Sequence, residues 1–201
     1  MYLTITRRCP VPLALCSLLL TSCSSTASGN LSSSPDRPVL RRFHVQGAGV
    51  PRGLEAGQAG VSCPSAGSCV TVGSGIYSTP TRSWGVSFSE IWDGKRWRYA
   101  TMPGGGTNSV SCAAASRCVA VGDTESGGTQ RAAALTWNGK AWAVTRVPAQ
   151  GKGQASIFLD VTCLSAADCV AVGQTGPNGY AHSTALTAFW NGQCWRLVAA
   201  G

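Results

Sequence analysis

The stretch that decides the fold runs from Val110 to Trp142. It reads VSCAAASRCVAVG over residues 110–122 and, after a polar segment, ALTWNGKAW over residues 134–142. Closely similar versions of these two motifs occur once before this stretch and once after it. The chain is therefore built on an internal repeat, and the repeat has to be explained before any single residue in it.

The three copies begin at Val61, Val110 and Val161, 49 and then 51 residues apart. A period near fifty with four short strands in each unit is typical of propeller-type arrays. We therefore expect an all-β fold of three four-stranded antiparallel units in a β-propeller-like array. The units are expected at about 59–103, 108–148 and 159–198, within a repeat domain spanning 55–201.

Each unit ends in a hairpin whose turn contains Asp-Gly or Asn-Gly. These dipeptides predict a two-residue type I′ turn, in which both central residues need positive φ. That register sets Trp92 opposite Lys95, so that Trp92 and Trp97 form a diagonal cross-strand pair on one face. We expect all such pairs to pack between sheets, with carbohydrate stacking as the alternative; the residues are Trp92, Trp97, Trp137, Trp142, Trp190 and Trp195.

Ten cysteines in 201 residues indicate an oxidising compartment. A disulfide is expected to close the first hairpin of each unit, pairing Cys63 with Cys69, Cys112 with Cys118 and Cys163 with Cys169. Each bridge should stabilise the fold by about 2.4 kcal/mol on the chain-entropy estimate. Paired cysteines can also bind zinc, but the spacing and the lack of matching histidines argue against it, so no metal or cofactor is expected.

Cys194 has no counterpart in the other two units. The predicted type I′ register places it opposite Phe189, on the face away from the tryptophans. This position favours a small buried filler over a reactive thiol, and intermolecular pairing stays open.

Residues 1–23 have the features of a secretory leader: Arg7-Arg8 followed by an apolar run from Val11 to Leu20. The leader ends in Leu20-Thr-Ser-Cys23, which resembles the bacterial lipobox and predicts lipidation of Cys23; an ordinary cleaved leader is the alternative. Residues 24–54 are expected to form a Ser/Pro-rich flexible tether and an approach to the repeat. The protein is then lipid-anchored at the outer face of the cell membrane, or else secreted.

The repeated residues carry a family resemblance. The pattern Val-Ser-Cys-x5-Cys-Val-Ala-Val-Gly … Trp-Asn-Gly-x-x-Trp resembles the repeats of secreted and lipid-anchored proteins of high-GC actinobacteria. The resemblance covers about residues 59–198 and implies an exported protein with a β-propeller-like domain, without a settled activity. Three units are fewer than the four to eight of ordinary propellers, so either an open array or two chains completing a six-unit ring is expected.

Charge and chemistry exclude several classes of function. The net charge of +8 becomes +6 once Arg7 and Arg8 are removed with the leader, and the remaining basic residues are scattered, so no nucleic-acid partner is expected. No pair of facing carboxylates and no nucleophile motif is recognisable, which argues against an enzyme.

The segments that differ among the units are expected at one end of the array, where repeat proteins display binding surfaces. We therefore expect a module that binds a glycan, peptide or protein at the cell envelope. A hydrolase acting on envelope material and a purely structural assembly unit are the alternatives. The bulky and polar residues of the variable segments are the candidate contacts: Tyr77, Arg82, Trp84, Asn178, Tyr180 and His182.

Overall fold

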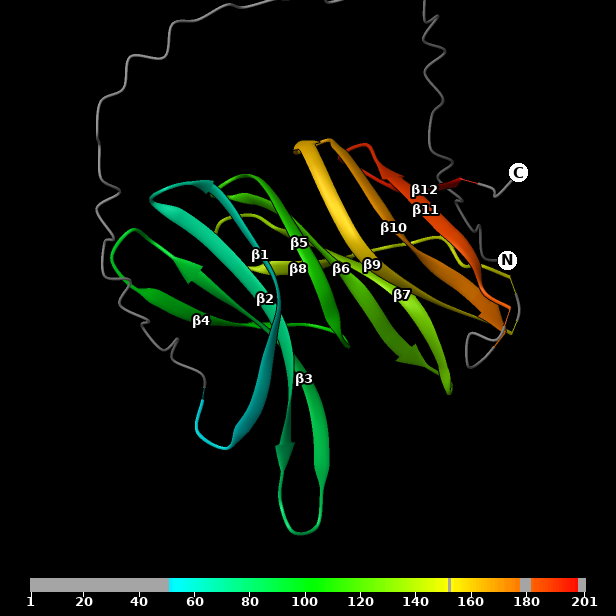
Figure 1. The fold of residues 1–201 in the computed structure, drawn as a ribbon, viewed down its shortest axis with the longest axis horizontal. Helices are drawn as coiled ribbons and strands as arrows, with labels where there is room; N and C mark the ends of the chain where they lie inside the picture. The colour runs from blue at the N-terminus through cyan, green and yellow to red at the C-terminus, as the bar shows by residue number, and fades with distance from the viewer. Residues whose placement is uncertain (1–50, 152, 178–181, 199–201) are drawn as a thin grey trace, which may run out of the picture. The chain divides into compact units, whose positions relative to one another are not determined.

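The computed structural model describes residues 51–151, 153–177 and 182–198. The predicted leader, the lipidation site Cys23 and the tether up to residue 50 lie outside the described residues. Twelve β-strands and no helix occur in the described part (Figure 1), so the predicted all-β class is confirmed. Consistent with this, none of the described residues forms a helix that could cross a membrane.

The strands form three antiparallel four-stranded sheets in chain order, as the repeat predicts. We call them sheets A, B and C. Sheet A contains β1 (Leu54–Ser65), β2 (Ser68–Ser78), β3 (Ser83–Trp92) and β4 (Trp97–Met102). Sheet B contains β5 (Thr107–Ala114), β6 (Arg117–Ser126), β7 (Thr129–Trp137) and β8 (Trp142–Thr145). Sheet C contains β9 (Gln154–Ser165), β10 (Asp168–Pro177), β11 (Thr184–Trp190) and β12 (Trp195–Val198).

Each sheet contains the predicted disulfide across its first hairpin. The pairs are Cys63–Cys69, Cys112–Cys118 and Cys163–Cys169, with Cα–Cα distances of 4.0, 3.9 and 4.0 Å. In sheets B and C the two cysteines are direct partners in the strand register, which brings their β-carbons close enough for a bridge. The three short-range disulfides of the prediction are thus confirmed.

The second turn of each unit is wider than predicted. Trp92 lies directly opposite Trp97, not opposite Lys95, and only the glycine of the turn, Gly94, has positive φ. The reason is the residue before that glycine: Asp93 Oδ1 accepts hydrogen bonds from the backbone N–H groups of both Lys95 and Arg96. A side chain that accepts two N–H groups favours a four-residue turn over a two-residue one.

Asn138 and Asn191 make the same pair of bonds in sheets B and C. The wider turn also corrects the expected place of Cys194, because the partner of Phe189 is Arg196. Cys194 lies in the turn, is half-buried and does not offer a free thiol. It is therefore not the buried filler that the type I′ register predicted.

The segments predicted as variable loops are largely strand. Most of Ser74–Ser87 belongs to β2 and β3, which pair out to Ser78 and Ser83. Residues 123–130 likewise continue β6 and β7, leaving only Gly127 and Gly128 as a two-residue turn in which both have positive φ. Both positions therefore favour glycine, since most other residues rarely adopt this backbone conformation.

Every sheet has two different faces because side chains alternate along a strand. One face bears the disulfide and the tryptophan pair, and we call it the tryptophan face. The other bears the Val-x-Val residues before the glycine, such as Val119 and Val121 in sheet B, and we call it the valine face.

The two hydrophobic cores lie between sheets and follow one rule. In the first core, Val70 and Val72 of sheet A's valine face pack against Trp137 and Trp142 of sheet B. In the second core, valine-face residues of sheet B, including Val119 and Val121, pack against sheet C's tryptophan face; the sheet C residues include Val161, Ala171, Trp190 and Trp195. The valine face of one sheet thus covers the tryptophan face of the next, and we call each such contact a joint.

Candidate functional site

The candidate contact residues of the first unit come together on the β2–β3 hairpin. Tyr77 and Trp84 are partners in its register, and residues 79–82 form its tip. The tip is fixed by Thr79, whose backbone N–H donates to the carbonyl of Arg82 at 2.8 Å and whose hydroxyl bonds both backbone groups of Arg82. The hairpin extends beyond the rest of sheet A (Figure 1). We call residues 76–84 the aromatic hairpin.

The side chains of the aromatic hairpin form an exposed stack. The Tyr77 and Trp84 rings are 5.4 Å apart between centroids and inclined by 27°. The Arg82 guanidinium lies 5.5 Å from the centre of the Trp84 ring, a distance at which cation and ring attract each other. Trp84 is 40% exposed and Ile76 51% exposed. The remaining described tryptophans are buried or half-buried, so Trp84 is set apart from the pairs that pack between sheets.

A shallow groove follows the base of the aromatic hairpin. It is lined by Glu55, Ser74, Gly75, Ile76, Gly85, Val86, Gly105 and Gly106. A β-carbon at Gly75 or Gly105 would lie 2.6 Å from a carbonyl oxygen of a neighbouring strand, so these two positions cannot carry a side chain without a shift of the backbone. The groove therefore offers backbone groups, the Glu55 carboxylate and the side chains of Ser74, Ile76 and Val86, and none of the three stacked side chains lines it.

The candidates of the third unit are not brought into this cluster. His182 is exposed and lies between β10 and β11 of sheet C, on a different sheet from the aromatic hairpin. Its φ of 62° places it in the left-handed region. Asn178 and Tyr180 lie outside the described residues. Of the six predicted contacts, the structure therefore assembles Tyr77, Arg82 and Trp84.

Sequence reasoning missed a buried carboxyl group on the tryptophan face of sheet A. Glu90 is only 1% exposed; its register partners are Thr71 and Tyr99. Gln58 Nε2 donates a hydrogen bond to Glu90 Oε2, while Oε1 and the Thr71 hydroxyl have no partner. Burial raises the pKa of Glu90, and the bond from Gln58 lowers it by a smaller amount.

Burial also raises the pKa of the neighbouring Tyr99, with smaller contributions from Tyr77 and Glu90. A sequence signal for the buried acid did exist. The other two units have Leu135 and Ala188 at the position of Glu90, so a charged residue stands where the repeat is otherwise apolar. We expect such a position to be buried, and an acidic side chain there to have a shifted pKa.

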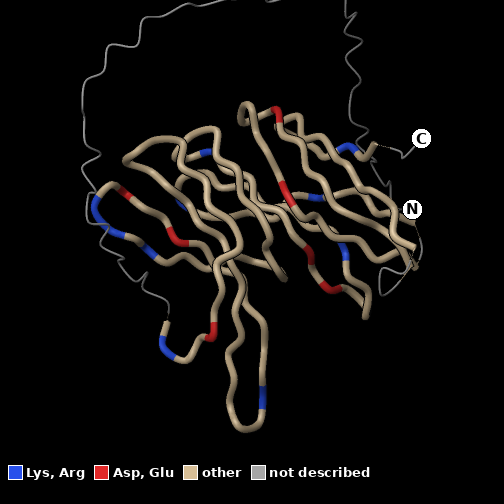
Figure 2. The backbone as a smooth tube through the Cα atoms, viewed as in Figure 1, with Lys and Arg blue, Asp and Glu red and all other residues tan. Residues whose placement is uncertain are grey.

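Charged and metal-binding groups are dispersed elsewhere. Lys and Arg are spread over the three sheets, with the densest group at Lys95, Arg96 and Arg98 around Asp93 (Figure 2). Within the described ranges, no three His, Cys, Asp or Glu side chains are placed to hold a metal ion. A second groove lies at the disulfide end of sheets B and C, where Arg117, Asn138 and Ser165 are among its lining residues.

Comparison with known proteins adds no relative: no family model, no curated protein and no solved structure matches the chain.

Proposed function

We propose that this chain is an exported lipoprotein whose repeat domain forms a propeller-like array and binds a partner at the cell envelope through the aromatic hairpin. Cys23 carries the lipid, residues 24–54 tether the domain, and the outer face of the cell membrane is its location. The disulfides support an extracytoplasmic location, since such bonds persist in oxidising compartments.

The observation that carries the proposal is the exposure of the Tyr77–Trp84 stack. A folded domain gains stability by covering tryptophan, and the other described tryptophans are covered at least in part. Trp84 instead stands 40% exposed beside Arg82. Tryptophan, tyrosine and arginine are the residues that dominate the binding energy of protein interfaces, so a protein or peptide is the partner that this hairpin fits best.

The propeller-like arrangement is supported by the way the sheets follow one another. The first strands of the sheets are neighbours, β1 beside β5 and β5 beside β9, as the inner strands of a propeller would be. The same pair of faces meets in both joints. In the part of the chain that the structure describes, the array stays open between sheets C and A.

A photo-crosslinking experiment in intact cells tests the binding proposal. In the full chain, a photoreactive amino acid replaces Tyr77. In the control it replaces Lys140, an exposed residue in the Asn138 turn of sheet B. We expect a protein adduct from position 77 only, lost when Trp84→Ala is added. Equal adducts from both positions, or none, would contradict a hairpin that binds a protein.

Two further outcomes identify the alternatives. Quenching of tryptophan fluorescence by purified envelope polysaccharide that is lost in Trp84→Ala, without a protein adduct, would make the partner a glycan. Breakdown of that polysaccharide by the purified protein would instead support the hydrolase. Lipidation has a separate test: Cys23→Ala should release the protein from membranes, and persistent membrane association would contradict the anchor.

A further inference from the structure

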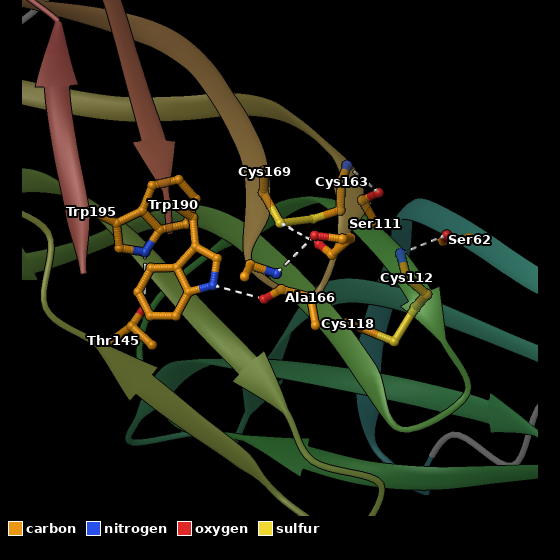
Figure 3. Close-up of a disulfide and its surroundings, with 12 residues drawn as sticks. Ser62, Ser111, Cys112, Cys118, Thr145, Cys163, Ala166, Cys169, Trp190 and Trp195 are labelled. Atoms are coloured by element: carbon orange, nitrogen blue, oxygen red, sulfur yellow. Dashed lines mark hydrogen bonds between the residues drawn. A yellow bond between two sulfur atoms is a disulfide. The ribbon is translucent and has the colours of Figure 1, made fainter. Parts of the chain in front are cut away.

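The two joints share a hydrogen bond that explains the Val-Ser-Cys motif. The backbone N–H of Cys112 donates to the Ser62 hydroxyl of the preceding sheet at 2.9 Å. In the next joint the N–H of Cys163 donates to Ser111, also at 2.9 Å (Figure 3). The motif serines of sheets A and B are thus acceptors for the motif cysteine of the following sheet.

A second hydrogen bond is also common to both joints. Trp142 Nε1 donates to the Ser89 hydroxyl at 2.8 Å, and Trp195 Nε1 donates to the Thr145 hydroxyl at 3.0 Å. Ser89 pairs with Ala100 across its sheet, while Thr145 pairs with Ala134. In each joint, one residue of this cross-strand pair on the valine face thus supplies the hydroxyl that accepts the indole N–H of the next sheet.

Among the described residues, no sheet precedes the tryptophan face of sheet A. Val61 on this face is 64% exposed, whereas its counterparts Val110 and Val161 are 5% and 6% exposed. Trp92 and Trp97 are half-buried, whereas the tryptophan pairs of sheets B and C are buried. Apolar side chains that are covered in two units are left open in the first.

The valine face of sheet C is also exposed, and it is the kind of face that packs on a tryptophan face in the two joints. Val172 is 45% exposed although its counterparts Val72 and Val121 are fully buried. Phe189 and Val198 on the same face are each 46% exposed. The two open faces, the tryptophan face of sheet A and the valine face of sheet C, are thus the same two kinds of face that pack together in each joint.

The hydroxyl groups that a third joint needs are also in place. Thr162 stands at the position of Ser62 and Ser111 in the motif. Thr187 stands at the position of Ser89 and pairs with Val198 across sheet C. Thr162 is exposed and Thr187 half-buried, and both lie on a side of sheet C that no other described sheet covers.

We propose that the open faces are covered by a second copy of this chain, the valine face of sheet C in each copy packing on the tryptophan face of sheet A in the other. Thr162 then accepts the N–H of Cys63, and Thr187 accepts Nε1 of Trp97, across each contact. Such a head-to-tail contact closes into a ring when the rotation allows it. Propellers have about four to eight units, and six is the one multiple of three in that range, so two copies form the ring.

Glu90 does not oppose this arrangement. Although it lies on the tryptophan face of sheet A, it is already 1% exposed within a single chain. A second copy therefore removes almost no further water from its carboxyl group, and the cost of burying this group is already included in the folding of one chain.

The test uses two variants at exposed positions of the two faces, in full-length lipidated protein purified in detergent. Valines at these positions share a core in both existing joints, Val72 with Val110 and Val121 with Val161. Val172→Asp and Val61→Lys should therefore each weaken association by at least about a hundredfold, because a charge is buried without a partner. Light scattering gives the mass of each variant, and that of the wild type should correspond to two chains.

Mixing the two variants distinguishes a head-to-tail ring from other dimers. In the mixed pair one joint is wild-type, and the other brings the introduced aspartate of one copy beside the introduced lysine of its partner, so the two-chain mass should return. Val144→Arg is the matched control, since Val144 is 61% exposed on sheet B, whose faces already form joints. It should keep the two-chain mass.

Near-ultraviolet circular dichroism verifies that each variant is folded, and Phe189→Asp replaces Val172→Asp if that variant is not. A wild-type protein that stays a single chain over the accessible concentration range would overturn the proposal. Larger open assemblies, or a mixture that fails to restore the two-chain mass, would overturn the closed ring.

Discussion

Trp97 and Trp142 occupy the same place in two copies of one motif, and their surroundings differ. Trp142 is 7% exposed and donates its Nε1 proton to Ser89, while Trp97 is half-buried on a face that no other described sheet covers. Both face a second tryptophan at a similar centroid distance, 5.4 Å for Trp142 and 5.6 Å for Trp97. The hairpin therefore builds the pair, and the preceding sheet decides how much stability the pair contributes.

The largest test of this comparison is the removal of each indole. Trp142→Ala should lower the free energy of unfolding by about 3–5 kcal/mol, because a buried side chain leaves a cavity. Trp97→Ala should cost clearly less under conditions in which the chain is monomeric. Urea unfolding followed by circular dichroism measures both, and equal losses would show that the sheet-to-sheet contact is not what stabilises the pair.

Removal of the disulfides gives the next largest effect. Each bridge closes a loop of the same length, so Cys→Ala at both ends should cost about 2.4 kcal/mol in any unit by the chain-entropy term. Cys118 is 2% exposed, whereas Cys63 is exposed, so the sheet B bridge should cost more than the sheet A bridge. Thermal unfolding of the two double variants measures the difference. Under mild reductant, the Cys63–Cys69 bridge should open first.

Removing the hydroxyl at the second position of the Val-Ser-Cys motif should have a smaller effect on stability, and the effect should differ between sheets B and C. Ser111→Ala leaves the N–H of Cys163 without its acceptor and should cost about 1 kcal/mol. Thr162→Val, at the same position of sheet C, should leave the monomer almost unchanged because its hydroxyl faces an open side. Urea midpoints compare the pair. A loss at Thr162 as large as that at Ser111 would contradict the assignment of these bonds to the joints.

Replacing Glu90 should change how the free energy of unfolding depends on pH. Because burial raises the pKa of Glu90, the folded chain holds this proton more tightly than the unfolded chain. The resulting stabilisation is complete below the unfolded pKa and is lost as pH rises through the folded pKa. Glu90→Gln should remove that loss and be the more stable protein at neutral pH. Urea unfolding from pH 4 to 8, with exposed Glu55→Gln as control, measures the slope.

The sequence predicted the sheets well because their determinants are local and occur three times. Valines around the glycines, cysteines six residues apart and tryptophans before Asn-Gly or Asp-Gly each specify a strand or a hairpin. The turn register was wrong because a side chain, Asp93 or Asn138, accepts the N–H groups that a two-residue turn would leave to the backbone. Composition also hid the aromatic hairpin, since the glycines and serines around Tyr77 and Trp84 indicate loop although the strands continue through them.

The candidate site was predictable only in part. Tyr77, Arg82 and Trp84 were identified because they are bulky residues in a variable segment, and the hairpin register then brought them together. His182 belongs to the third sheet, as the repeat predicts, but the repeat pattern does not specify whether the variable segments of different units meet. Glu90 was missed because burial depends on which strands flank a position, and a lone acid in sequence gives no sign of this unless the units are aligned.

The motif serine has a consequence for how such a chain can change its length. The middle unit donates on one face through the N–H of Cys112 and accepts on the other through Ser111. A duplicated unit therefore arrives with both halves of the connection and needs no adaptive substitution to be stacked between its neighbours. Deleting a middle unit likewise reunites compatible ends. The gene can gain or lose whole modules while the protein between them stays well packed.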